Sequence, residues 1–349
     1  VVAAIVPWNF PLMMACWKLG PALATGNSVV LKPAEFTPLS ASLWGGIFEE
    51  AGLPKGVFNM VHGFGEEGYA GDPLVKHPDV PLISFTGESR TGQIIFANAA
   101  PHLKGLSMEL GGKSPAVVFE DADLDAAIDA TIFGVFSLNG ERCTAGSRIL
   151  VQRSVYDEFV ERYAAQASRV KVGLPDDETT EVGAIVHPEH FEKVMSYVEI
   201  GKTEARLVAG GDRPEGFPEG NFVQPTVFAD VAPDARIFQE EIFGPVVAVT
   251  TFKDADDALA LANDLAGRDG RRFLFFELLA ERTLAEVQLR HLNDAQSGYA
   301  LRLFDFLEPV LETCLDAGIA IVTNGGAANP TAAATSTTKN TTPTAATNY

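Results

Sequence analysis

The sequence is short of cysteine, of basic residues and of long apolar runs. Its three cysteines, Cys16, Cys143 and Cys314, are too few and too scattered for a disulfide scaffold, which favours a reducing, cytoplasmic location. It has 26 basic residues against 46 acidic ones, and this net charge of −20 argues against nucleic acid as a partner. No apolar run reaches the roughly 20 residues that span a bilayer, so we expect no membrane partner either.

A recognisable set of metal ligands is also missing. The six histidines are scattered, and the pair His187 and His190 has no nearby cysteine or acidic pattern that would complete a zinc signature. We interpret both as ordinary histidines and predict that the protein requires no metal.

What is present is a regular alternation of strand and helix patterns. In residues 1–110, the segments VVAAIV, SVVLK, PLISFTG and LSMEL resemble strands. The segment MMACWKLGPALATG, between VVAAIV and SVVLK, resembles a helix. This alternation predicts an α/β fold with a doubly wound parallel sheet, which binds ligands at the carboxyl ends of its strands.

Residues 111–263 predict a second α/β unit. PAVVF, SRILVQ and PVVAVTTF are typical of strands, and residues 123–140 of a helix with Asp near its start. The segment SVYDEFVERYAAQASRV predicts an amphipathic helix, with Ser154 as its N-cap.

The pattern changes near residue 264. RRFLFFELLAERTLAEVQLRHL predicts a helix, and LRLFDFLEPVLETCLDAGIAIVTNGG predicts a helix followed by a strand. Residues 331–349 are almost entirely Thr, Ala and Asn, which predicts a disordered tail.

Cys143 is the first candidate for chemistry. It follows the helix of residues 123–140 in FSLNGERCTAG, and the adjacent Arg142 could lower its pKa and favour the nucleophilic thiolate. Taken alone, an inert cysteine is an equal alternative. Cys16 and Cys314 are interpreted as small buried residues.

Two further residues could work with this thiol. Glu109, in SMELGGKSP, stands at the end of a strand, where a carboxylate can act as a general base on water. Asn9, in PWNFP, is held between two prolines, and its amide can donate to an oxyanion. The ordinary alternatives are a strand-end cap for Glu109 and a turn residue for Asn9.

A nucleotide could bind at the same strand ends. Lys32 and Glu35, in LKPAE, follow a strand where a ribose would lie in a dinucleotide-binding fold, although they could be a plain surface pair. In FTGESRTG, Gly87 and Gly92 lie between a strand and a helix, which suits a close approach of phosphate. This signal is weak alone, because it matches no standard phosphate-binding motif.

Seven ordered segments together resemble the aldehyde dehydrogenase superfamily over residues 1–263. They are PWNFP, WKLGPALATGN, LKPAE, SFTGESRTG, MELGGKSP, NGERCTAGSR and EEIFGP. The resemblance implies a doubly wound NAD-binding sheet and an α/β catalytic domain, and oxidation of an aldehyde to a carboxylic acid through a cysteine thiohemiacetal and thioester. In this family, Cys143 would be the nucleophile, Glu109 the base and Asn9 the oxyanion donor.

The resemblance also implies the cofactor site. A carboxylate at Glu35 would repel a ribose 2′-phosphate, so NAD is expected rather than NADP. The residues expected to bind it are Ile5, Trp8, Lys32, Glu35, Gly65, Gly87, Glu88, Gly92, Glu241 and Phe243.

Two positions depart from the common family pattern. Glu141 stands where Gln is frequent, and Glu88 where Ser is frequent. Both resemble the branch that oxidises 5-carboxymethyl-2-hydroxymuconate semialdehyde in aromatic catabolism, and we expect Arg142 to receive a substrate carboxylate. Betaine aldehyde and succinate semialdehyde are the alternative substrates.

The resemblance predicts four regions. Residues 1–110 would be the NAD-binding domain and residues 111–263 the catalytic domain, each lacking a part, so that the fold is expected to be truncated at both ends. The family forms homo-oligomers, but the oligomerisation strand is expected to be absent. Residues 264–330 would be a foreign α/β fragment, of which 268–330 resemble the acyclic-terpene-utilisation family, and residues 331–349 the tail. The alternative function is an inactive nucleotide-binding remnant.

Overall fold

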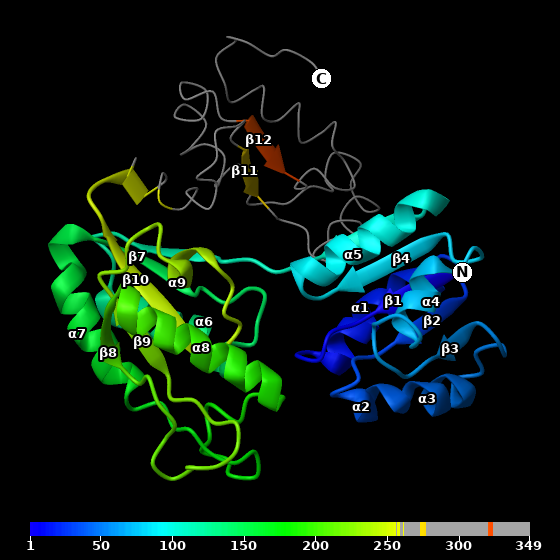
Figure 1. Ribbon diagram of the computed structural model, residues 1–349, viewed down its shortest axis with the longest axis horizontal. Helices are drawn as coiled ribbons and strands as arrows, with labels where there is room; N and C mark the ends of the chain where they lie inside the picture. The colour runs from blue at the N-terminus through cyan, green and yellow to red at the C-terminus, as the bar shows by residue number, and fades with distance from the viewer. Residues whose placement is uncertain (256, 259–260, 262–272, 277–319, 324–349) are drawn as a thin grey trace. The chain divides into compact units, whose positions relative to one another are not determined.

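The computed structural model describes residues 1–255, 257, 258, 261, 273–276 and 320–323. The chain forms two compact units, residues 1–265 and residues 266–349. Within the first unit there are two five-stranded sheets, which Figure 1 shows in blue to cyan and in green to yellow.

The first sheet is built from residues 2–109. Its elements are β1 (Val2–Ile5), α1 (Pro11–Ala24), β2 (Val29–Lys32), α2 (Pro38–Ser42), α3 (Trp44–Glu50), β3 (Phe58–Met60), α4 (Gly71–Lys76), β4 (Leu82–Thr86), α5 (Ser89–Ala99), the 3₁₀ turn η1 (Ala100–His102) and β5 (Gly105–Glu109). The strand order is β3-β2-β1-β4-β5, and every neighbouring pair is parallel. The predicted doubly wound parallel sheet is confirmed.

The central strand β1 shows why this sheet is covered on both faces. Val2 and Ala4 pack in a core with side chains of α1 and α3, whereas Ala3 and Ile5 pack in another with α4 and α5. Successive side chains of a strand point to opposite faces, so a strand buried on both faces has to be apolar throughout. The run VAAI meets that requirement, and all four residues are buried.

The second sheet is built from residues 115–252. Its elements are β6 (Pro115–Val118), α6 (Leu124–Phe136), η2 (Ser137–Gly140), β7 (Arg148–Gln152), η3 (Arg153–Val155), α7 (Tyr156–Ala167), α8 (Pro188–Glu204), β8 (Arg206–Ala209), β9 (Thr226–Ala229), α9 (Arg236–Gln239) and β10 (Val246–Phe252). The order is β6-β7-β10-β9-β8, in which only the edge strand β8 is antiparallel to its neighbour.

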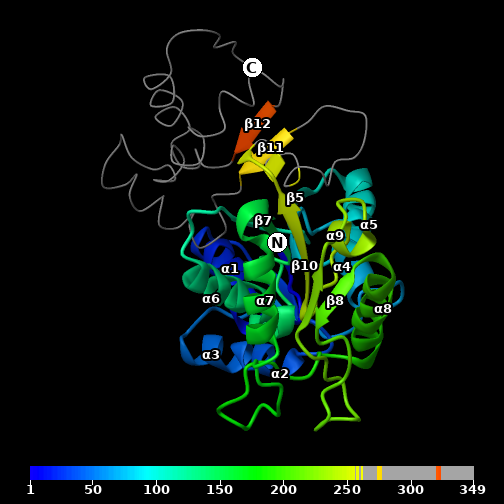
Figure 2. The same cartoon turned by 90° about the vertical axis from the view of Figure 1, so that its left-hand side faces the viewer.

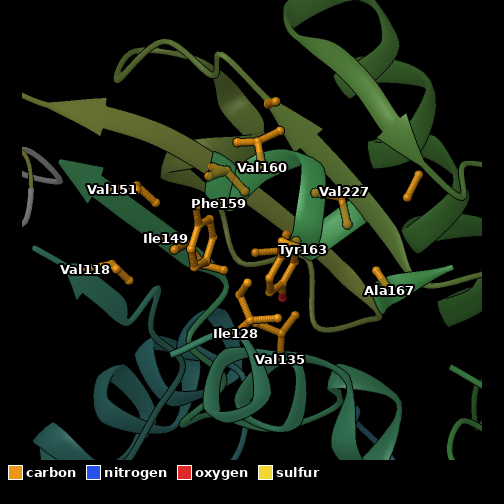
Figure 3. Packing of buried hydrophobic residues seen from close by; sticks show 14 of the residues in the cluster. Val118, Ile128, Val135, Ile149, Val151, Phe159, Val160, Tyr163, Ala167 and Val227 are labelled. Carbon is orange, nitrogen blue, oxygen red and sulfur yellow. The ribbon is translucent and has the colours of Figure 1, made fainter. Parts of the chain in front are cut away.

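This sheet is also covered on both faces. Helices α6 and α7 pack against one face and α8 and α9 against the other, as Figure 2 shows on the two sides of β10. On the first face, the rings of Phe159 and Tyr163 stack with centroids 5.4 Å apart. Figure 3 shows both rings among aliphatic side chains of α6 and of the sheet.

Helices α6 and α7 begin in different ways. Asp123 caps α6, since its carboxylate accepts a hydrogen bond from the main-chain nitrogen of Ala126 at 3.2 Å. The prediction that Ser154 caps α7 is wrong: the N-cap is Val155, and the hydroxyl of Ser154 donates to Glu120 at 2.7 Å. The reason is the 3₁₀ turn η3, which lies between β7 and α7 and contains Ser154, so that α7 begins later than the pattern predicted.

In the second unit, β11 (Phe273–Phe276) pairs in parallel with β12 (Ala320–Thr323). The predicted strand in AIVT is confirmed. The helix predicted from residue 271 is wrong at its start, because FLFF is a strand, and short apolar runs do not distinguish a buried strand from a helix. The other helices predicted there and the predicted tail lie outside the described residues.

Among the described residues, no helix is long and apolar enough to cross a membrane.

The stability of the fold should depend strongly on the ring of Phe159 in the core of the second sheet. Phe159 has no exposed surface, so we expect Phe159→Ala to lower the free energy of unfolding by about 3–5 kcal/mol, through lost burial and a residual cavity. Urea unfolding followed by circular dichroism measures the change. Phe96→Ala, at a ring that is 62% exposed, is the matched control and should change it by less than about 0.5 kcal/mol; equal effects of the two would contradict this packing.

Candidate active site

A cavity of about 410 Å³ lies at the carboxyl ends of β1, β4 and β5. Segments of the second sheet's half of the unit close it: the loop after η2, the start of α8 and the loop before β10. Seven of the residues predicted from the sequence line it, namely Trp8, Asn9, Gly87, Glu88, Cys143, Glu241 and Phe243.

Strand register explains why these segments meet. In the parallel sheet, Ile5 of β1 is level with Phe85 of β4, and Thr86 is level with Glu109 of β5. The chain therefore leaves three strands at one height, and the residues that follow each strand surround one space. Trp8 and Asn9 follow β1, Gly87 and Glu88 follow β4, and Leu110 and Gly111 follow β5.

The thiol of Cys143 is half-buried and faces this cavity. Burial raises its pKa above the ordinary value, and the negative charges of Glu241 and Glu109 raise it further, while main-chain N–H groups act in the opposite direction. The expectation that Arg142 lowers this pKa is wrong. The guanidinium of Arg142 donates instead to Ser137 at 2.6 Å and to Thr144 at 3.3 Å, so it is drawn to other groups of its own loop.

Glu109 is the last residue of β5, as predicted. It does not line the cavity, but it pairs with Thr86, which does. Its carboxylate is close enough to the thiol of Cys143 to act on the pKa of that thiol. The fold thus brings together two residues that are far apart in the chain.

Asn9 connects the two halves of the unit. Its amide nitrogen donates to the main-chain carbonyl of Glu141 at 2.8 Å, two residues before Cys143. An amide nitrogen carries two hydrogens, and only one is used in this bond, at a residue that lines the cavity. The amide oxygen of Asn9 is buried and has no hydrogen-bond partner in the described part of the chain.

The pair Lys32 and Glu35 lies at the end of β2. The ammonium of Lys32 is 3.0 Å from the carboxylate of Glu35 and also donates to the main-chain carbonyl of Pro33. Neither side chain lines the cavity, but the next residue, Phe36, does. Ile5 is buried at the end of β1 and does not line the cavity either.

The three predicted glycines have different surroundings. Gly87 lines the cavity, and a Cβ there would overlap the ring of Phe85. Gly92 lies in α5, where a Cβ would be 2.5 Å from the side chain of Leu110, so its role in the structure is close packing of helix against strand end. Gly65 is exposed and does not line the cavity.

Glu241 is held by the loop that follows β5. Its carboxylate accepts a hydrogen bond from the main-chain nitrogen of Gly112 at 3.2 Å, and a Cβ on Gly111 would overlap that carboxylate. Burial raises the pKa of Glu241, while the bond from Gly112 and the charges of Lys193 and Lys113 lower it.

The model of the family described as "Aldehyde dehydrogenase family" matches residues 1–268. The chain belongs to the aldehyde dehydrogenase family. It is 52% identical over 271 residues to 5-carboxymethyl-2-hydroxymuconate semialdehyde dehydrogenase of Escherichia coli, covering 76% of this chain and 57% of that protein. It is 44% identical over 265 residues to the chloroplastic betaine aldehyde dehydrogenase of Beta vulgaris, covering 76% and 53%.

Solved structures of the family share this fold. HpcC from Thermus thermophilus is 51% identical with a TM-score of 0.73, covering 78% of this chain and 53% of that one. Betaine aldehyde dehydrogenase from Staphylococcus aureus in complex with NAD⁺ is 43% identical with a TM-score of 0.73, covering 75% and 52%. The chain thus spans a little more than half the length of the relatives it matches.

A second family model, "Acyclic terpene utilisation family protein AtuA", matches residues 253–345. The resemblance predicted for residues 268–330 is confirmed by this match. The sequence from residue 253 to 268 is common to both matches.

The cavity of this aldehyde dehydrogenase chain contains residues that the sequence patterns did not reveal. His187, His190 and Lys193 come from the start of α8. The ring of His190 lies 5.3 Å from that of Trp8 and 6.1 Å from that of Phe243, and its Nε2 is 2.7 Å from the main-chain oxygen of Phe243. The only signal in the sequence was the close spacing of the two histidines; in the structure His187 is the N-cap of α8 and His190 lies in its first turn.

Behind the cavity, Lys113 is buried without a hydrogen-bond partner among the described residues. Burial, with a contribution from the positive charge of Arg148, lowers its pKa to about 7, although Glu241 and Glu240 raise it. An unpaired amine of this kind costs folding free energy, because water no longer solvates it.

We therefore expect Lys113→Met to stabilise the fold at pH 7, by about 1–3 kcal/mol, because the folded state no longer buries the amine. An unfolded lysine keeps its proton up to its ordinary pKa of 10.5, whereas the folded one loses it near 7. Wild-type stability should therefore rise with pH between these values, and the advantage of the variant should shrink. Urea unfolding at pH 7 and pH 9 tests both points, with Lys253→Met, at an exposed side chain, as control. A variant less stable than wild type at pH 7 would refute the prediction.

Proposed function

We propose that the first unit oxidises an aldehyde to a carboxylic acid with NAD as hydride acceptor. The observation that carries this proposal is a cavity lined by both Cys143 and Asn9, with the carboxylate of Glu109 outside the lining but near enough to raise the pKa of the thiol. A nucleophile, an oxyanion donor and a base are the groups that acyl transfer through a thioester requires.

The steps follow from these positions. The thiolate of Cys143 attacks the aldehyde carbon, and the free hydrogen of the Asn9 amide and the N–H of Cys143 stabilise the resulting oxyanion. Bound NAD would supply the hydride acceptor, so that the thiohemiacetal on Cys143 loses hydride from its carbon and becomes a thioester, and the positive charge of NAD would favour the thiolate, whose pKa burial raises. Glu109 then accepts a proton from water, which attacks the thioester carbon; the acid leaves and the thiol is restored.

Several residues fit a dinucleotide. Lys32 and Glu35 stand where ribose hydroxyls lie in folds of this type, and the carboxylate of Glu35 would repel a 2′-phosphate. Trp8, Phe243 and Glu241 face the cavity with the thiol, in a position to enclose the nicotinamide and its ribose. The buried, unpaired amide oxygen of Asn9 offers one more acceptor at the same place.

Each of the two sheets is assigned to one domain. We infer that residues 1–110 form the nucleotide-binding domain and residues 111–263 the catalytic domain, because each range contains one five-stranded sheet with helices on both faces. Residues 264–330 are proposed as a separate fragment of different origin, in keeping with the second family match.

We propose a semialdehyde that bears a carboxylate as the substrate class. Arg142 precedes the nucleophile but does not line the cavity; its guanidinium donates to the hydroxyls of Ser137 and Thr144 and forms no ion pair with an acidic side chain in the described ranges. Its buried Nε atom also has no partner there. Arginine binds carboxylates through two parallel hydrogen bonds, and the name of the E. coli relative describes a carboxylated semialdehyde.

The first test removes the nucleophile. Cys143→Ala should abolish NADH formation, measured at 340 nm with an aldehyde and NAD, because no thioester can form. Cys16→Ala should keep the wild-type rate: Cys16 is exposed, so its interpretation as a buried residue is wrong, whereas Cys314 lies outside the described residues. A Cys143→Ala rate equal to wild type would sink the proposal. A wild-type chain that binds NAD yet forms no NADH would favour the inactive nucleotide-binding remnant.

The second test concerns the substrate. Arg142→Gln should lower kcat/KM for a carboxylated semialdehyde by about tenfold or more, the loss of roughly 1.5–3 kcal/mol from a charged hydrogen bond. For a neutral aliphatic aldehyde the value should hardly change. Steady-state kinetics with 5-carboxymethyl-2-hydroxymuconate semialdehyde, succinate semialdehyde, betaine aldehyde and propanal separate the candidates. Equal losses on the carboxylated semialdehydes and on propanal or betaine aldehyde, which carry no carboxylate, would contradict a role in carboxylate binding.

A further inference from the structure

The loop that leads to Cys143 has a strained backbone. Leu138 and Asn139 adopt left-handed conformations, with φ of 53° and 60°, directly before Gly140 with φ of 69°. Such conformations cost free energy in residues other than glycine, and they persist only where surrounding contacts determine them. The loop therefore depends on groups that hold it from outside.

Two side chains of the loop supply these contacts. The amide of Asn139 accepts a bond from the main-chain nitrogen of Gly183 at 2.7 Å and donates to the carbonyl of Ala184 at 3.0 Å. The carboxylate of Glu141 accepts a bond from the main-chain nitrogen of Val186 at 3.2 Å and another from the Asn139 amide at 3.2 Å. Both side chains thus fasten the loop to the segment before α8.

The main chain of Glu141 forms the next link. Its carbonyl accepts the hydrogen bond from the Asn9 amide at 2.8 Å, and Cys143 follows two residues later. A shift of this peptide group would move the amide of Asn9 relative to the thiol.

We propose that Glu141 is a positioning residue, whose carboxylate fixes the peptide that orients the Asn9 amide toward the carbonyl oxygen of a substrate bound to Cys143. The inference rests on the proposed function, since it assigns a role within that same site. Both groups that face the carboxylate, the Val186 N–H and the Asn139 NH₂, are donors. An ionised carboxyl satisfies both, whereas an amide would oppose its own NH₂ to one of them.

Ionisation of Glu141 should therefore matter for the site. Burial raises the pKa of Glu141 to about 7, against the two hydrogen bonds, which lower it. The titratable side chain that faces it from α8 is His190, whose Nε2 lies 4.0 Å from the carboxylate and whose pKa burial lowers. From its own loop, Cys143 is two residues away. No lysine or arginine in the described ranges forms an ion pair with Glu141, so the carboxylate should gain a proton near neutral pH.

The experiment compares two reactions of the same thiol in the full chain, neither of which needs NAD. Iodoacetamide alkylates the Cys143 thiolate with loss of iodide, and no oxyanion forms. With 4-nitrophenyl acetate, the thiolate attacks the acetyl carbon and an oxyanion forms. The oxyanion collapses, 4-nitrophenolate departs, and the acetyl group remains on Cys143 as a thioester. Mass spectrometry of the peptide that carries Cys143 follows both. Both rates depend in the same way on the fraction of Cys143 that is ionised. The ratio of the acylation rate to the alkylation rate is therefore independent of that fraction and measures how well the oxyanion is stabilised.

At pH 8 we expect Glu141→Gln to lower the acylation rate about tenfold, the effect of about one misplaced hydrogen bond, with little change in alkylation. In wild type, the ratio should fall as pH decreases through about 7, the pKa of Glu141, because protonation removes an acceptor. The ratio should be low and independent of pH in Glu141→Gln. Glu141→Asp, which keeps a carboxylate, should retain the pH dependence.

Glu199→Gln, at an exposed carboxylate paired with Lys202, is the matched control and should behave as wild type. An unchanged ratio in Glu141→Gln, or parallel loss of both reactions, would overturn the assignment while the proposed function stands. A wild-type Cys143 that reacts with neither reagent would overturn the proposed function and this inference together.

Discussion

The site depends on the parallel pairing of β1 with β4 and of β4 with β5. Parallel strands all end at the same edge of a sheet. The turns that follow these strands therefore lie close together, although they are far apart in the sequence. The register places Ile5, Phe85 and Met108 at one level. A slip of one residue in any pair would send the buried side chains to the opposite face and would move a cavity-lining turn out of place.

Several ionisable groups that are costly to bury lie close together in and around the cavity between the two sheets. Lys113 has a lowered pKa, and Glu141, Glu241 and the Cys143 thiol have raised ones, with burial as the largest cause in each case. Most other charged side chains of the unit are exposed or form ordinary surface ion pairs, such as Arg162 with Glu158. Clusters of perturbed ionisable groups mark functional sites more often than structural ones. The unit therefore gives up folding free energy in the place where it gathers its reactive groups.

Much of the arrangement could be predicted from the sequence, because the informative residues lie in contiguous motifs beside strand ends. Asn9 after β1 and Glu109 at the end of β5 follow from hydrophobic runs and the rule for parallel sheets. The contribution of α8 could not be predicted, because its N-cap His187 and the helix residues His190 and Lys193 belong to none of the motifs that pointed to the site. The direction of Arg142 could not be predicted either, since it depends on hydrogen bonds to Ser137 and Thr144. Because Arg142 is next to Cys143 in the sequence, we expected its charge to lower the pKa of the thiol. In the folded loop the pKa of the thiol is raised.

The contact between Gly140 and the chain at Gly244 has a consequence for how this protein can vary. Gly140 has a positive φ, and a Cβ there would overlap the main-chain oxygen of Gly244. The neighbouring atoms belong to backbone, which cannot rotate away as a side chain can. Alanine is excluded as firmly as tryptophan, so in a scan of all substitutions this position should tolerate none, irrespective of size or polarity. Selection on such a residue would resemble that on a catalytic group, although glycine offers no reactive atom of its own.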